Sequence, residues 1–189
     1  MGSYYYLMAQ LPHLIYDQRP PMSCESFKTL AESQLPKKDA ALFKFLSLSP
    51  DFCEKRKSGC SFIDNWYKWD NSLRLNLAKQ RTIKLKREVT AAEPPDYHMD
   101  AAAAAIKAVD EDSPLEAEIL LDKARWHAIE NLAGNDYFHR NTVFAYYLKL
   151  MLIERREAFN VDKGFAEYKT LYASILDDFE SMQNAGDHK

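Results

Sequence analysis

Glycine is scarce in this chain, with 5 among 189 residues, and cysteine is scarcer still, with 3. All-β folds and glycine-rich nucleotide-binding loops need many positions with positive φ, so the low glycine content argues against both. The cysteines Cys24, Cys53 and Cys60 are odd in number and none are spaced as CxxC. We therefore expect no disulfide scaffold and a reducing compartment.

Long apolar runs are also missing. The most apolar stretch, residues 142–153 (TVFAYYLKLMLI), contains Lys149 and covers about 12 residues, whereas a membrane-spanning helix needs about 20. The opening MGSYYYLMAQLPHL lacks the basic start and long apolar core of a signal peptide. We expect that the chain does not itself span a membrane.

Apolar residues at helical spacing are abundant, and prolines separate them into helix-sized segments. The residues Phe62, Trp66, Trp69, Leu73 and Leu77 advance by 4, 3, 4 and 4, which is typical of one buried helical stripe. Towards the end of the chain a second stripe advances by 3, 4, 3, 4 and 3, namely Phe165, Tyr168, Tyr172, Ile175, Phe179 and Met182. No segment shows sustained alternation with period 2. These patterns predict an all-α fold, a helical bundle of about six to seven helices.

The helix limits follow from caps and breakers. Ser113, Pro114 and Glu116 form a capping box with proline at the first helical position. The predicted helices cover about 23–35, 37–48, 61–85, 97–109, 113–132 and 136–159, followed by the helix that carries the last stripe, with a loop at 49–61. An internal boundary is predicted at 89–95, which divides the chain into an N-terminal helical segment, 1–93, and a C-terminal bundle, 94–189, unless the two form one continuous domain.

Asp70 and Arg74 are the first candidates for a functional site. On an ideal helix Asp70, Arg74 and Arg81 lie within about 40° of each other, at one edge of the apolar stripe. They could form a polar contact to a partner. Alternatively, Asp70 and Arg74 form an exposed i,i+4 ion pair, worth a few tenths of a kcal/mol at most.

Catalytic and metal-binding patterns are incomplete. A carboxylate-bridged metal centre in a helical bundle needs Glu-x-x-His on two helices. Here His127-x-x-Glu130 has the reverse order, and Asp136-x-x-His139 occurs once. No cysteine has a histidine at a diagnostic spacing, and neither GxGxxG nor a P-loop occurs. We expect no enzymatic activity, no metal and no cofactor.

Nucleic-acid binding is the other alternative, because a basic run occupies residues 79–87. However, the tryptophans precede the run rather than interleaving with it, and an acidic block at 110–118 offsets it. The net charge of −3 leaves no surplus of positive charge for phosphates. We expect no nucleic-acid partner. Charges segregated in this way fit a protein that docks other proteins.

Several segments resemble an uncharacterised bacterial family whose members are encoded among the subunits of V/A-type ATPases. These segments are YYYLMAQLPHL with the following PPMS, WYKWDNSLRLNLAKQR, SPLEAEILLDKARW and FHRNTVFAYYLKLMLIERREAFNVDKG. The resemblance covers most of the chain. Its motifs are moderately specific, since they are helix faces rather than ligand sets.

A weaker resemblance reaches the C subunit of A-type ATPases, whose eukaryotic counterpart is called d. The C subunit begins with a Y-x-Y-x-x-A pattern, which is similar to Tyr4, Tyr6 and Ala9 here. Its E-x-D-x-x-N-[IL]-x-x-[IL]-[IL]-R stretches resemble 69–74, and its aYl-x-x-k-x-x-E-x-R pattern resembles 145–155. The C subunit is an all-α funnel of three bundles that couples the membrane rotor ring to the central stalk, and this chain is a little over half its length.

The resemblance implies a non-catalytic subunit of a bacterial V/A-type ATPase that couples the central stalk to the rotor ring in proton or sodium transport. The implied partners are the D subunit of the central stalk and the rotor ring. The implied location is cytoplasmic and peripheral on the inner face of the membrane, with membrane contact only through the complex. The implied interface or structural polar residues are Asp70, Asn71, Arg74, Arg81, Glu154 and Arg155. The alternative is a helical adaptor or assembly factor that is not a permanent subunit.

Overall fold

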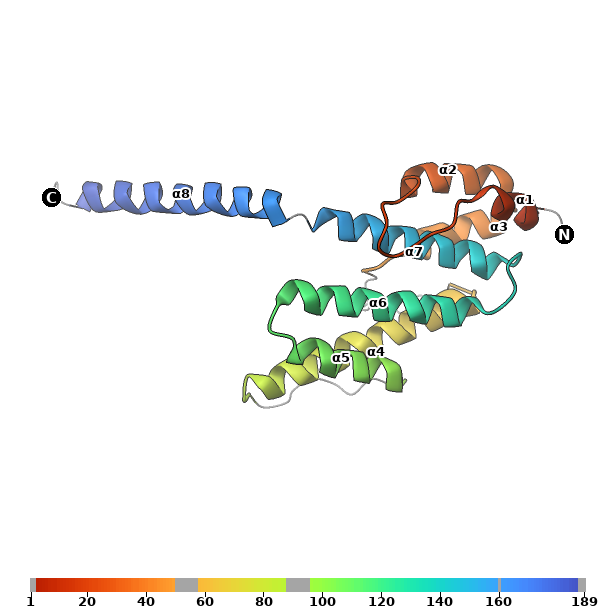
Figure 1. The fold of residues 1–189 in the computed structure, drawn as a ribbon, viewed down its shortest axis with the longest axis horizontal. Coiled ribbons are helices and arrows are strands. Elements are labelled where there is room, and N and C mark those ends of the chain that lie inside the picture. The colour runs from red at the N-terminus through yellow and green to blue at the C-terminus, as the bar shows by residue number, and fades with distance from the viewer. Residues whose placement is uncertain (1–2, 50–57, 88–95, 160, 187–189) are drawn as a thin grey trace. The chain divides into compact units, whose positions relative to one another are not determined.

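The computed structural model describes residues 3–49, 58–87, 96–159 and 161–186 (Figure 1). Within these ranges it has eight α-helices, one 3-10 helix and no strand, so the predicted all-α fold is confirmed. The elements are α1 (Ser3–Gln10), α2 (Cys24–Gln34), α3 (Lys37–Ala40), η1 (Ala41–Phe45), α4 (Ser61–Lys84), α5 (Met99–Asp110), α6 (Pro114–Ala133), α7 (Arg140–Ala158) and α8 (Val161–Gly186). The helix expected at 37–48 is divided into α3 and the 3-10 turn η1.

The chain forms two compact units, Met1–Glu154 and Arg155–Lys189. The first holds α1 to α6 and most of α7, and the second holds the end of α7 and α8. The boundary predicted at 89–95 lies outside the described residues. On either side of it, α4 and α5 pack along each other within the first unit (Figure 1).

Helix α4 is the longest element of the first unit and buries its predicted stripe. All five stripe residues are buried, and the rings of Trp66 and Trp69 stack with centroids 6.0 Å apart. The alanine-rich helix α5 turns Ala101, Ala104 and Ala105 inward. Because alanine is small, α5 can approach α4 closely, and α6 packs against both helices.

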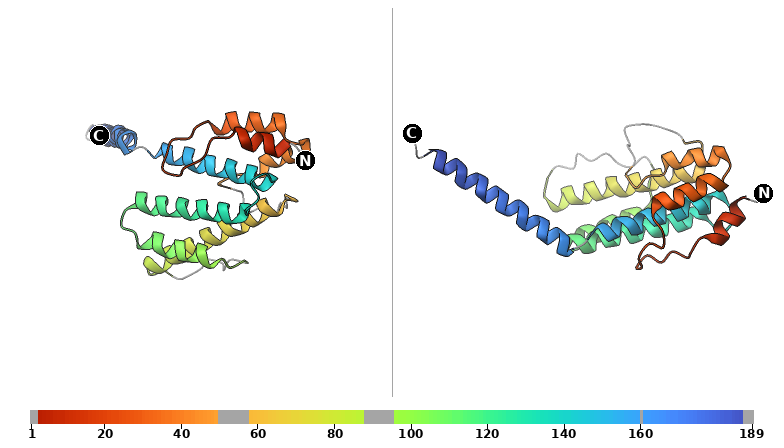
Figure 2. Two further views of the ribbon diagram at one scale, coloured as in Figure 1. Left: turned by 45° about the vertical axis from the view of Figure 1, so that its right-hand side comes forward. Right: turned by 90° about the horizontal axis from the view of Figure 1, so that it is seen from above.

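Helix α7 lies between α2 and α6 (Figures 1 and 2). Towards α2 its contacts are aromatic, with the rings of Phe27 and Tyr146 stacked at 5.0 Å. Towards α6 the ammonium of Lys149 lies over the ring of Trp126, 4.6 Å from its centroid. Helix α7 buries residues on several of its sides because it has one neighbouring helix on each side.

The predicted cap at Ser113 is present, and Ser23 caps α2 in the same way. The hydroxyls of Ser23 and Ser113 accept hydrogen bonds from the main-chain N–H groups of Ser26 and Glu116, at the starts of α2 and α6. Gly134 ends α6 with φ of 73°, a left-handed conformation that favours glycine. No helix in the described part of the chain combines the length and apolarity needed to cross a membrane.

Candidate functional site

Asp70 is the centre of a buried ion-pair network that joins three segments of the first unit. Its side chain is fully buried on α4. One carboxylate oxygen accepts from Nε of Arg74 at 2.7 Å, and the other accepts from Nε of Arg125 on α6 at 3.1 Å. Arg125 also donates to Asp122 at 2.8 Å, and Arg74 donates to the carbonyl of Leu48 at 2.7 Å. The network therefore ties α4 to α6 and to the segment after η1.

The charges of this network balance, with two carboxylates and two guanidinium groups. Burial alone would lower the pKa of Arg125, but the carboxylates of Asp70 and Asp122 outweigh burial and raise it. Arg125 is 4% exposed, so it depends on these two partners. The interpretation of Asp70 as part of an exposed pair is wrong, because the side chain lies under α6; the predicted i,i+4 contact with Arg74 itself is confirmed.

The other predicted polar residues are dispersed. Asn71 is half-buried beside Asp70, whereas Arg81 is exposed near the end of α4 and is not brought into the network. Arg155 belongs to the second unit, where its guanidinium lies 5.7 Å from the ring centroid of Phe159. The structure thus brings Asp70 and Arg74 together, and places Arg81, Glu154 and Arg155 elsewhere.

Glu154 has a defined contact in the first unit. Its carboxylate accepts from the main-chain N–H of Cys24 at 2.6 Å, at the first residue of α2. A negative charge there is favourable because helix N-termini carry unsatisfied donors and the positive end of the macrodipole. Burial, with help from Glu154, raises the pKa of the Cys24 thiol well above its usual range. Cys24 is therefore a poor nucleophile.

A second polar cluster joins α1, α3 and the start of α7. Asp39 is 2% exposed, accepts from the hydroxyl of Tyr4, and lies 3.6 Å from the guanidinium of Arg140. Burial and the hydrogen bond to Asp39 raise the pKa of Tyr4 to about 12. These contacts hold α1 against the helices, so Tyr4 has a structural role.

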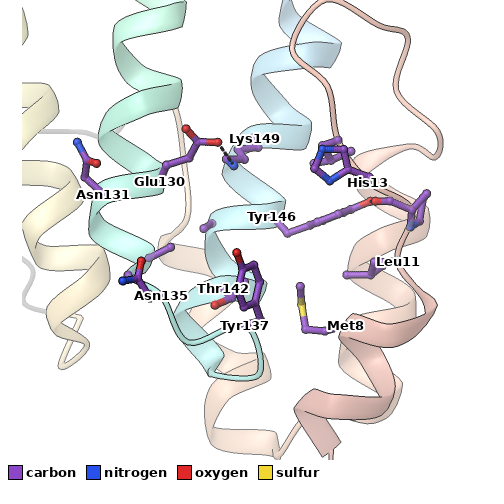
Figure 3. A pocket seen from close by; sticks show the side chains of 15 residues that line it. Met8, Leu11, His13, Glu130, Asn131, Asn135, Tyr137, Thr142, Tyr146 and Lys149 are labelled. Carbon is purple, nitrogen blue, oxygen red and sulfur yellow. Dashed lines mark hydrogen bonds and ion pairs between the residues drawn. The ribbon is translucent and has the colours of Figure 1, made fainter.

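A pocket of about 690 Å³ opens between the segment after α1, the end of α6 and helix α7 (Figure 3). Met8 and Leu11 line one side of it, and Tyr137 lines another. Tyr146 crosses between α7 and the N-terminal segment, where its hydroxyl donates to the carbonyl of Pro12 at 3.0 Å. The lining is mixed apolar and polar rather than dominated by one kind of side chain.

The charged groups in this pocket are paired with each other. Lys149 donates to Glu130 at 2.7 Å, and the indole N–H of Trp126 donates to the same carboxylate oxygen at 3.0 Å. Burial would raise the pKa of Glu130, but the hydrogen bond from Lys149 and its positive charge lower it. The carboxylate therefore stays ionised and bonded, which makes it a poor general acid or base at neutral pH.

Exposed aromatic residues gather next to the pocket, and we call Tyr5, Tyr6, Tyr137 and Phe138 the aromatic cluster. The rings of Tyr5 on α1 and Phe138 before α7 lie 4.7 Å apart, and those of Tyr5 and Tyr6 lie 5.9 Å apart. Tyr6 is 66% exposed and Tyr137 74%. Exposed aromatic side chains of this kind are enriched at protein–protein contacts.

The sequence missed two of these features for the same physical reason. Arg125 lies 55 positions from Asp70, and Phe138 lies far along the chain from Tyr5, so both contacts depend on how helices pack. One local signal existed, because Asp122 and Arg125 stand three apart on the face of α6 that buries Leu121. In the described ranges no group of three or more His, Cys, Asp or Glu side chains is placed to hold a metal.

These features define an all-α scaffold whose buried charges join helix to helix and whose exposed aromatic residues are available for contacts. Residues 93–178 match the model of a family described as a protein of unknown function (DUF2764). The match includes α5, α6, α7 and part of α8, just under half of the chain, while α4 with Asp70 lies outside it. Neither the curated proteins nor the solved structures contain a match to the chain. The coarser part of the expectation, resemblance to an uncharacterised family, is thus confirmed for residues 93–178.

Proposed function

We propose that the chain is a non-catalytic subunit of a bacterial V/A-type ATPase, which couples the central stalk to the membrane rotor ring in proton or sodium transport. The proposal starts from the resemblance of its helical segments to proteins encoded with that complex. It assigns the chain to the cytoplasmic side, peripheral to the membrane, with the D subunit of the central stalk and the rotor ring as partners.

The buried charged residues support a structural rather than a catalytic role, because each of them is bonded to another side chain. Asp39, Asp70, Asp122 and Arg125 are the buried charged residues of the described part of the chain, and each has a side-chain partner. Ion pairs from Asp70 and Asp39 join one helix to another. Since breaking a buried pair is costly, such ties oppose relative movement of the helices, as a coupling protein requires.

The aromatic cluster is the surface on which we expect the partner to dock. Large, rigid aromatic side chains give much contact area at little entropic cost. The pocket beside the cluster can receive an apolar side chain of the partner between Met8 and Leu11. We expect the paired Glu130 and Lys149 to form its polar edge.

Purification of the ATPase from its native source tests the proposal. The chain is expected to remain with the A, B and D subunits through the last step, in fixed proportion to the central stalk in the active enzyme. An assembly factor, the alternative function, is expected to be present in assembly intermediates and absent from the active enzyme. If the chain is found with neither, the proposal is wrong.

A matched pair of variants tests the docking surface. Tyr5→Ser combined with Phe138→Ser removes the closest ring pair of the aromatic cluster, and we expect at least about a tenfold loss of the chain recovered with the complex. Tyr97→Ser is the control, because Tyr97 is 68% exposed but precedes α5, outside the cluster. Equal recovery of both variants would contradict the assignment of this surface.

A further inference from the structure

Helix α8 carries an apolar stripe whose described side chains are exposed. Phe165, Tyr168, Tyr172 and Ile175 are 53–60% exposed. Among the described residues of Arg155–Lys189, the other helical residues are those at the end of α7. A helix this apolar on one face and this long needs a partner to bury the stripe.

The spacing of the stripe identifies the kind of partner. Counted from Val161, the first residue of α8, the stripe advances by 4, 3, 4, 3, 4 and 3 to Met182. Its residues therefore alternate between heptad positions d and a, with Tyr172 at position a and Ile175 at position d. The helix has 26 residues, which is more than three heptads. An apolar repeat of 3.5 residues does not match the 3.6 residues per turn of a straight α-helix. Such a repeat therefore favours two helices that supercoil around each other over one helix packed on a flat surface.

We propose that α8 pairs with α8 of a second copy of this chain in a parallel, in-register coiled coil. In that arrangement position g of one helix faces position e of the next heptad on the other. Leu171 is at g and Leu176 is at e, and they are 61% and 43% exposed. Each Leu171 therefore meets Leu176 of the other copy, and the two leucine pairs widen the apolar seam.

The outer face of α8 agrees with this arrangement, since it holds small or polar residues. Positions b, c and f of the described side chains are Ala166, Glu167, Thr170, Ala173 and Ser174. The apolar seam thus lies on one face of α8, and small or polar residues lie on the opposite face, as a two-stranded coiled coil requires.

The antiparallel alternative fits less well. In antiparallel pairs e faces e and g faces g. In one antiparallel register Lys169 lies opposite Lys169, and in another Asp178 lies opposite Asp178. In the register between these two, Leu171 lies opposite Asp178. The parallel pair brings no like charges together, because Lys169 meets Gly164 and Asp178 meets Gln183. The proposal rests on α8 alone and does not depend on the proposed function.

The mass of the full chain in solution tests the proposal directly. Sedimentation equilibrium and light scattering are expected to give twice the chain mass of 21.9 kDa, with dissociation on dilution. Tyr172→Lys buries a charge at position a, and we expect it to weaken the association at least about a hundredfold. Thr170→Lys, at the outer position f of the same helical turn, is the control and should associate as the native chain does.

Cysteine cross-linking tests the orientation. In a chain whose own cysteines are replaced, Ile175→Cys at position d should form a disulfide between copies under mild oxidation, and Ser174→Cys at position c should not. Cross-linking of both variants alike, or of neither, overturns the parallel register. If a replaced native cysteine prevents folding, the mass of the native chain still decides whether copies associate. A native chain that stays monomeric at every concentration, including one whose α8 folds back on its own first unit, overturns the proposal.

Discussion

Asp70 connects two guanidinium groups, one from its own helix and one from α6. Its contact with Arg74 follows from the sequence, because residues four apart lie on the same face of a helix. Its burial does not, since burial depends on α6 covering that face of α4. Burial changes how much the ion pair contributes to stability. An exposed pair contributes a few tenths of a kcal/mol, whereas removal of one partner from a buried pair costs several kcal/mol.

Asp70→Asn preserves the shape of the side chain and removes its charge, leaving Arg125 buried with Asp122 as its remaining carboxylate. We expect the free energy of unfolding to fall by about 3–5 kcal/mol, measured by urea denaturation. Asp96→Asn is the control, because the Asp96–Lys68 pair is 3.6 Å apart and about half exposed. The free energy of unfolding of this variant should fall by less than about 1 kcal/mol. Similar small losses in both variants would show that the buried network does not stabilise the fold.

Three of the tyrosines contribute to the expected response to alkaline pH. Burial raises the pKa of Tyr4, Tyr67 and Tyr146 to about 12, from about 10 in an unfolded chain. Between these values the unfolded chain has lost protons that the folded chain keeps, so the folded state becomes less stable as the pH rises. Their contribution is fully present below pH 10 and lost between about pH 10 and 12.

Urea denaturation at a series of pH values measures this loss. Tyr67→Phe removes one of the three groups, so its free energy of unfolding should fall less steeply between about pH 10 and 12 than that of the native chain. Parallel curves for the two chains would mean that Tyr67 does not titrate with a raised pKa.

At the scale of elements, local signals predicted most helix limits. The caps at Ser23 and Ser113 and the end of α6 at Gly134 depend on bonds within one turn, which the sequence specifies. The 37–48 segment was less predictable. There Phe43 is buried and packs against Phe144 with ring centroids 5.6 Å apart, so tertiary packing determines the 3-10 turn more than helix periodicity does.

The start of α2 is held in two ways, and the local one can be tested alone. Ser23→Ala removes the hydroxyl that accepts from the N–H of Ser26 at 3.1 Å. We expect the free energy of unfolding to fall by about 1 kcal/mol in urea denaturation, while Glu154 keeps its bond to Cys24. Ser61→Ala, at the exposed first residue of α4, is the control and should change the free energy of unfolding by less than about 0.5 kcal/mol. An equal loss at both positions would contradict a capping role for Ser23.

At the scale of the whole molecule, the buried residues are unevenly divided between the two units. Every buried hydrophobic residue of the described chain lies at or before Ile153, and the described side chains of α8 are exposed. The seam spacing in α8 was visible in the sequence, but the exposure of its described side chains was not, because amphipathic periodicity does not specify what buries the apolar face. The first unit therefore contains the core, and α8 presents a surface.

This division predicts that the first unit folds without α8. A chain that ends at Ala158 keeps every buried side chain among the described residues, so in dilute solution its free energy of unfolding should lie within about 1 kcal/mol of the native value. A chain that ends at Leu148 loses Leu150, Leu152 and Ile153, each at most 1% exposed. Because loss of one such side chain costs about 2–5 kcal/mol, this shorter chain should be unfolded at 25 °C. Circular dichroism with urea denaturation distinguishes the two, and an unfolded chain ending at Ala158 would show that the core extends into α8.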